Sequence, residues 1–199
     1  PLDMFVIDNN QNPSISSDWV VEGSVQLGDN YSSTNLTING EATFTGSFSM
    51  TYNSTLTNKG TIFFNGGLLF STPYSPSQTI VNDGIIEITG DLNQQAGSYS
   101  VINNNNGAVI TVNGKFLKSQ NTWLNNSGTI NISGSFKSSD YDQNVFKNSS
   151  GGVLNVNDSA IFKDINIISA VALEKGSEFN VGSSFFLSGS NGPFNVAGN

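Results

Sequence analysis

The sequence predicts an all-β protein, a single right-handed parallel β-helix (solenoid) with coils of roughly 24 residues. One observation is a short sequence unit that recurs along most of the 199 residues at a nearly constant period. A second is the alternation of apolar and polar residues inside each unit, which is typical of a strand with one buried face. The third is that no segment combines a helical period with helix-capping residues. These observations favour stacked strands over a helical or mixed fold.

The repeated unit reads apolar-x-Asn-x-x-Gly-x-apolar-x-apolar-x-Gly-x-apolar, and it is clearest in residues 82–92 and 125–136. The segment from Val25 to Gly28 is interpreted as a fragment of a first copy. The first residues of the central apolar pair, in chain order, are Leu36, Ile62, Ile86, Ile110, Ile130, Leu154 and Phe179. The steps between them are 26, 24, 24, 20, 24 and 25 residues. Seven matches at so regular a spacing are not expected by chance.

A repeat of this length suits a coil of three short strands, which buries its inner face only by stacking on copies of itself. Glycine and Asn-Gly between the apolar pairs allow positive φ, so the chain turns a corner there. The inner residues are then predicted to form columns. The first holds Ile62, Ile86, Ile110, Ile130, Leu154 and Phe179, the second Phe64, Ile88, Val112, Ile132, Val156 and Val181, and the third Leu68, Leu92, Phe116, Phe136 and Ala160. Phe185 is also expected in the core.

The repeat divides the chain into three parts. Residues 1–19 lack the unit and are predicted to be an N-terminal cap, because the open end of a solenoid exposes unpaired strand edges. Residues 20–187 form the parallel β-helix. Residues 188–199 are predicted to be its C-terminal end or the start of a linker or stalk.

The composition excludes several kinds of chemistry. The chain has no histidine or cysteine, and its seven basic residues are all lysines. Thiol and imidazole nucleophiles and the usual zinc sites are therefore impossible, and we expect no metal, cofactor or catalytic residue. A net charge of −8 argues against nucleic acid as a partner. No apolar run approaches the ~18 residues of a membrane span, so no span is expected in this segment.

The repeated unit, as it stands in residues 82–92 and 125–136, resembles the right-handed parallel β-helices of surface adhesins. It is most similar to the N-terminal domain of fungal hyphally regulated and adhesin-like cell wall proteins, and next to bacterial filamentous-haemagglutinin-type exoproteins. The likeness covers about residues 20–181. It implies a secreted glycoprotein at the cell surface or in the cell wall, displayed on a longer stalk, with a role in cell adhesion.

Aromatic residues outside the columns are the candidates for ligand binding, because flat rings stack on sugars while their polar groups stay in water. The candidates are Tyr74, Tyr99, Trp123 and Tyr141. Edge packing over the coil corners is the alternative role. The expected partner is a host or abiotic surface, or a glycan or cell-wall polysaccharide, and self-association is a further possibility.

The asparagines are expected to have two roles. Asn58, Asn82, Asn125 and Asn148 occupy one repeat position before a corner, where stacked amides form a hydrogen-bonded ladder; a row of sugar-binding amides is the alternative. If the host is eukaryotic, glycosylation is expected among the Asn-x-Ser/Thr sites. These are Asn30, Asn35, Asn53, Asn125, Asn131, Asn148 and Asn157.

The function expected from these features is a non-enzymatic display module that contributes to adhesion or to matrix and wall structure. One alternative is a carbohydrate-active β-helix enzyme or a tail-spike-like depolymerase, which would need paired carboxylates. Asp140 and Asp142 are the only close acidic pair, and they are interpreted as solvated loop residues. The other alternative is a filament or surface-layer subunit that assembles through its ends.

Overall fold

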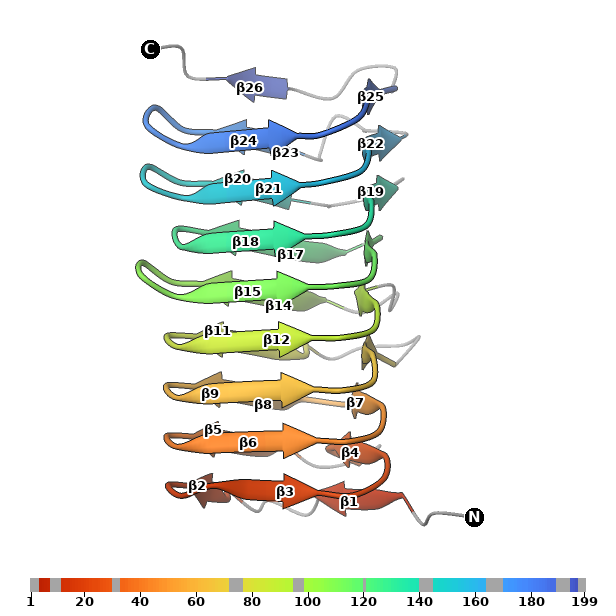
Figure 1. Cartoon of the computed structure of the whole chain (residues 1–199), viewed down its shortest axis with the longest axis vertical. Coiled ribbons are helices and arrows are strands. Elements are labelled where there is room, and N and C mark those ends of the chain that lie inside the picture. Colours follow the sequence, from red (N-terminus) through yellow and green to blue (C-terminus); the bar gives the residue numbers. More distant parts are fainter. Residues whose placement is uncertain are drawn as a thin grey trace.

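The computed structural model confirms the predicted fold class. It describes residues 4–7, 12–29, 33–71, 77–94, 99–119, 121–139, 145–163, 170–188 and 194–196. These residues form short strands and no helix, and every strand pairing is parallel. The strands belong to three sheets, here named A, B and C in the order in which the chain visits them. The result is a parallel β-helix with one strand of each sheet in each coil (Figure 1).

The three sheets share the same plan, in which each strand lies between its equivalents in the preceding and following coils. Sheet A contains β1 Phe5–Ile7, β4 Val25–Leu27, β7 Phe48–Met50, β10 Leu68–Phe70, β13 Leu92–Gln94, β16 Phe116–Lys118, β19 Phe136–Ser139, β22 Ala160–Lys163 and β25 Phe185–Leu187. Sheet B contains β2 Ser14–Ile15, β5 Thr34–Ile38, β8 Ser54–Asn58, β11 Thr79–Asn82, β14 Ser100–Asn104, β17 Thr122–Asn126, β20 Val145–Asn148, β23 Ala170–Leu173 and β26 Phe194–Val196. Sheet C contains β3 Trp19–Val21, β6 Glu41–Phe44, β9 Thr61–Phe64, β12 Ile85–Ile88, β15 Val109–Val112, β18 Thr129–Ile132, β21 Val153–Val156 and β24 Glu178–Val181.

The coil is right-handed, as predicted. In Figure 1 the strands of sheet C run from left to right across the front, and those of sheet B run from right to left behind them. The chain meanwhile climbs from its N-terminus at the bottom to its C-terminus at the top. This hand is the one that the right-handed twist of strands favours for parallel connections.

The predicted columns are confirmed by the strand register. Ile86 pairs with Ile110, and Ile110 with Ile130, so the three side chains stack on one inner face. The same register continues to Leu154 and Phe179. The second and third columns also pair as predicted, from Phe64 to Val181 and from Leu68 to Ala160. The inner residues are almost completely buried, except Phe179 and Val181 in the last coil of sheet C, which are half-buried, and the residues between them on each strand are exposed or half-buried.

The register of the first copy was predicted wrongly. Ile62 pairs with Ala42, while Leu36 pairs with Leu56 on sheet B. Leu36 and Ile38 have the spacing of the central apolar pair, but they lie in β5 of sheet B, which precedes sheet C in the coil. Similarly, Val25 lies on sheet A, where it pairs with Phe48, and so continues the third column. The short apolar strands of two neighbouring sides look alike in sequence, and only the stacking distinguishes them.

Strand pairing extends into both ends of the chain. Residues expected in a cap form β1 and β2 and the start of β3, and each of these strands pairs in register with the next coil. Likewise β26, beyond residue 188, pairs with β23. Phe185 continues the third column but is 45% exposed, because no further strand of the described part of sheet A follows β25.

A buried asparagine ladder lines the corner between sheets B and C, one residue per coil. Its members are Asn58, Asn82, Asn104, Asn126 and Asn148. Each Nδ2 donates to the Oδ1 of the next member at 2.8 Å. The remaining N–H groups donate to carbonyls at the start of sheet C, as Asn58 does to Ile85 at 2.9 Å. The backbones of successive coils are also in close contact at this corner, because a Cβ on Gly84 would overlap the carbonyl oxygen of Gly60.

The ladder was predicted with one wrong and one missing member. Asn125 points outward, and Asn126 occupies the ladder. Asn104, which the sequence argument omitted, occupies the position between Asn82 and Asn126. The error arises because the number of residues between the ladder asparagine and sheet C varies among coils, so a fixed Asn-x-x-Gly spacing selects the wrong neighbour.

Candidate functional site

Tyr99 and Trp123, two of the four predicted ligand-binding aromatics, lie against each other on the outer face of sheet B. Their ring centroids are 5.5 Å apart and the ring planes differ by 19°, so the rings are stacked. Tyr99 immediately precedes β14 and is 48% exposed, while Trp123 is the second residue of β17 and is half-buried. Alternation in β17 explains the outward ring, because its neighbours Thr122 and Leu124 point inward and are fully buried.

Two amides continue this surface along the same strands. Asn125 donates from Nδ2 to Oδ1 of Asn103 at 2.9 Å, and both side chains are half-buried. Trp123 itself pairs with Val101 on β14. We name Tyr99, Val101, Asn103, Trp123 and Asn125 the sheet B patch. It combines a stacked aromatic pair with neutral donors and acceptors, which is the chemistry that contacts the apolar faces and the hydroxyls of a sugar.

Buried polar groups hold this patch from inside the coil. Gln94 donates from Nε2 to the carbonyl oxygens of Ser100 and Trp123, each at 3.2 Å. Lys118 is 1% exposed and donates from Nζ to the carbonyl oxygen of Thr122 at 2.8 Å. These bonds fix the first residues of β14 and β17, which carry the aromatic pair. The patch is therefore supported by backbone that is anchored on its buried side.

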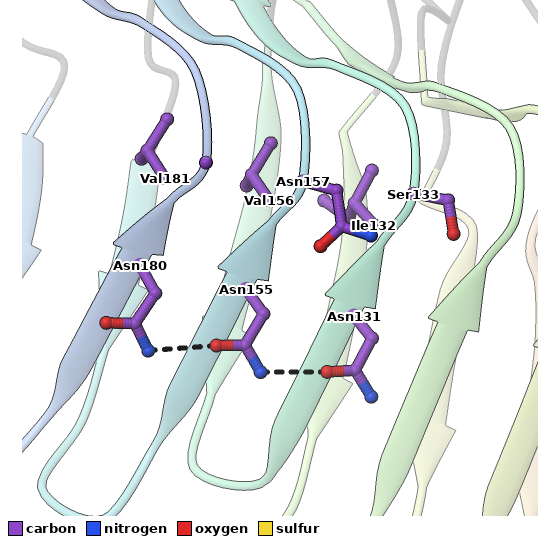
Figure 2. A pocket seen from close by; sticks show the side chains of 9 residues that line it. Asn131, Ile132, Ser133, Asn155, Val156, Asn157, Asn180 and Val181 are labelled. Carbon is purple, nitrogen blue, oxygen red and sulfur yellow. Dashed lines mark hydrogen bonds between the residues drawn. The ribbon is translucent and has the colours of Figure 1, made fainter.

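A second surface feature is a shallow groove of about 460 Å³ near the C-terminal end of sheet C. It follows the ends of β18, β21 and β24 and the turns after them, and we name it the sheet C groove (Figure 2). Its lining residues are Asn131, Ile132, Ser133, Asn155, Val156, Asn157, Asn180, Val181 and Gly182. None of the nine is charged, so the groove presents neutral polar groups beside the ends of the apolar columns.

Three outward asparagines form a row in this groove, as Figure 2 shows. Asn180 donates from Nδ2 to Oδ1 of Asn155, and Asn155 donates in the same way to Asn131, both at 2.9 Å. Strand pairing places the three residues opposite one another in successive coils. The row is thus an exposed counterpart of the buried ladder, with the amides in one orientation. From the sequence, Asn131 is predicted as a glycosylation site, and the row that it forms with Asn155 and Asn180 is not predicted.

The predicted glycosylation sites lie in different environments. Asn148 is fully buried and donates to the carbonyl oxygens of Gly152 and Glu178, so the folded chain leaves no room for a glycan there. Asn35 and Asn157 are exposed, and Asn53, Asn125 and Asn131 are half-buried. Asn125 lies in the sheet B patch, and Asn131 and Asn157 lie in the sheet C groove. A glycan at any of these three would cover the corresponding surface.

Several predicted residues lie outside the described residues, and they stay predictions. They are Asn30, Tyr74, Asp140, Tyr141 and Asp142.

The burial of Lys118 was not predicted, although the strand register indicates it. The third-column strands bury their first and third residues, and Lys118 is the third residue of β16.

The charged groups of the described residues lie mainly on the surface. Lys147 Nζ is 2.8 Å from Glu174 Oε1, with both side chains about two fifths exposed. This hydrogen bond, and then one from the Ser150 backbone, hold the pKa of Glu174 below its ordinary value. The described part of the chain contains no group of three or more Asp or Glu side chains suited to a metal ion. It also contains no helix long and apolar enough to cross a membrane.

Comparison with protein-family models, with curated proteins and with solved structures finds no match to this chain. The resemblance to surface adhesins therefore stays an expectation from the sequence.

Proposed function

We propose that this chain is a non-enzymatic display module, secreted to the cell surface or cell wall, that contributes to adhesion or wall structure by binding a neutral polysaccharide. The stacked Tyr99–Trp123 pair beside the Asn103–Asn125 amide pair is the observation that carries this proposal. Aromatic faces contact the C–H faces of sugar rings, and amides donate to and accept from sugar hydroxyls. A rigid β-helix suits display because each coil is held by the coils on both sides.

The patch favours a neutral ligand over an acidic one. Apart from Lys147, which pairs with Asn125 in the strand register and bonds to Glu174, its immediate strand neighbours are uncharged. The protein carries a net charge of −8, which disfavours polyanions in general. Binding through stacking and neutral hydrogen bonds is therefore expected to change little with salt.

A pull-down with insoluble neutral polysaccharides, such as chitin, β-glucan and mannan, tests this proposal. The protein is made in a host that does not add N-glycans, so that Asn125 is unmodified. Trp123→Ala should weaken binding at least ~10-fold, as expected for a central aromatic contact. Phe63→Ala is the matched control, because Phe63 is a half-buried, outward aromatic on sheet C. If the protein binds none of these polysaccharides, or if both variants bind equally well, the proposal is wrong.

A second candidate is a subunit that assembles through its ends. Most of the exposed large apolar side chains of the described residues lie in the first and last coils, with Val20 62% and Phe186 54% exposed. In the described sheets, β1 and β25 each have a strand partner on one side only, and such edges pair readily with another chain. End-to-end assembly would produce fibres, which sedimentation over a range of concentrations and electron microscopy would detect. Phe186→Lys should prevent their formation, whereas purely monomeric wild-type protein would exclude this function.

A further inference from the structure

We infer that the sheet C groove is a second binding site, which holds an extended, neutral β-linked glycan parallel to the axis of the solenoid. This inference rests on the proposed function and deepens it, because it names the shape and direction of the polysaccharide. It depends on a surface that is separate from the sheet B patch.

The hydrogen-bonding capacity of the asparagine row supports the inference. An amide has two N–H donors and an oxygen with two lone pairs. Asn155 uses one donor towards Asn131 and one lone pair towards Asn180. One N–H and one lone pair of Asn155 therefore stay available to the groove, side by side. Neighbouring sugar hydroxyls, each both donor and acceptor, complement this arrangement.

The spacing of the row indicates a polymer. Successive coils are separated by ~4.8 Å, so the three amides repeat at that interval along the solenoid. The rise per sugar of an extended β-1,4-linked glycan is close to this spacing, so successive sugars would meet successive amides. A peptide strand repeats at a shorter interval, and its backbone has no unpaired strand edge on this lateral face to pair with. The geometry thus favours a glycan over a peptide.

The opposite side of the groove provides further neutral groups. Ser133, Asn157 and Gly182 occupy the turns that follow β18, β21 and β24, and all three are exposed. Figure 2 shows the Asn157 side chain beyond the end of β21, away from the asparagine row. Gly182 lies close against the preceding coil, since a Cβ there would overlap the carbonyl oxygen of Asn157.

Calorimetric titration with linear oligosaccharides tests the inference, using cellulose- and chitin-derived chains from the disaccharide to the hexasaccharide. The protein is again made without N-glycans, because Asn131 and Asn157 are possible attachment sites. Affinity should rise with length up to the few sugars that span three coils, and then level off. Asn155→Ala should weaken binding of the hexasaccharide about tenfold, since it removes two amide hydrogen bonds to the ligand. Thr111→Ala is the control, because Thr111 pairs with Asn131 but does not line the groove.

The variants separate this inference from the proposed function. If Trp123→Ala weakens binding and Asn155→Ala does not, the groove is not a glycan site, although the patch is. If Asn155→Ala weakens binding and Trp123→Ala does not, the groove is confirmed and the patch is not. Absence of binding to any of the oligosaccharides and insoluble polysaccharides would overturn both. Unchanged melting temperatures of the variants show that any loss is not caused by unfolding.

Discussion

Asn82 donates from its side-chain Nδ2 to the side-chain Oδ1 of Asn104, one coil further on, at 2.8 Å. Both side chains are at most 1% exposed, so this bond is made without competition from water. The sheet B strands that carry the two residues pair in register, which aligns the amides. Each amide provides a hydrogen-bond partner for the next one, and polar groups are tolerated in a protein interior when they are hydrogen-bonded in this way.

The first prediction concerns this ladder. Asn104→Ala should lower the free energy of unfolding by about 3 kcal/mol, because it leaves the Asn82 donor and the Asn126 acceptor buried without a partner. Asn103→Ala, at the preceding outward position of β14, should cost less than about 1 kcal/mol. Urea denaturation of the two variants gives both values. Equal losses would mean that the ladder does not stabilise the fold.

The second prediction concerns the apolar columns. Ile130→Ala should cost roughly 2–5 kcal/mol, because Ile130 is fully buried between Ile110 and Leu154 and its removal opens a cavity. The Asn131 side chain points outward, so Asn131→Ala should change the free energy of unfolding by less than about 0.5 kcal/mol. Thermal and chemical denaturation measure both effects. A large loss for the Asn131 variant would contradict the assigned alternation.

The third prediction concerns the buried lysine. Lys118→Met should destabilise the protein by roughly 1–3 kcal/mol, since it removes the buried hydrogen bond from Lys118 Nζ to the carbonyl oxygen of Thr122. Lys137→Met is the control, because Lys137 pairs with Leu117 on the outer face of sheet A and is exposed. A more stable Lys118→Met variant would show that the desolvation of the ammonium group outweighs its hydrogen bond.

The fourth prediction concerns pH. The hydrogen bond from Lys147 lowers the pKa of Glu174 in the folded chain, so the ionised carboxylate is favoured by folding. Its contribution is therefore present above the ordinary pKa of 4.5, and it is lost as the pH falls through the lower folded value. The melting temperature of the wild type should exceed that of Glu174→Gln slightly at pH 7, and the difference should disappear in acid. High salt should also reduce it, because both groups are exposed. A difference independent of pH would contradict the ion pair.

The sequence alone determined the fold class and most of the core. Alternation at period two and a repeat of about 24 residues are both visible in the sequence itself. They are sufficient to place Ile86, Ile110 and Ile130 in one column. The sequence also identified Tyr99 and Trp123 as aromatics outside the columns, and the structure brings these two together.

Only the tertiary structure decided which residues meet between coils wherever the corners differ in length. The number of residues between sheets B and C varies, and the register of β17 with β20 places Asn126 rather than Asn125 opposite Asn148 in the ladder. The same stacking places Ala42 opposite Ile62, buries Lys118 and aligns Asn131, Asn155 and Asn180 in a groove. These are contacts between residues 20 to 25 positions apart. They depend on the register of whole strands, because one residue more or less in a corner moves a side chain to the opposite face of its sheet.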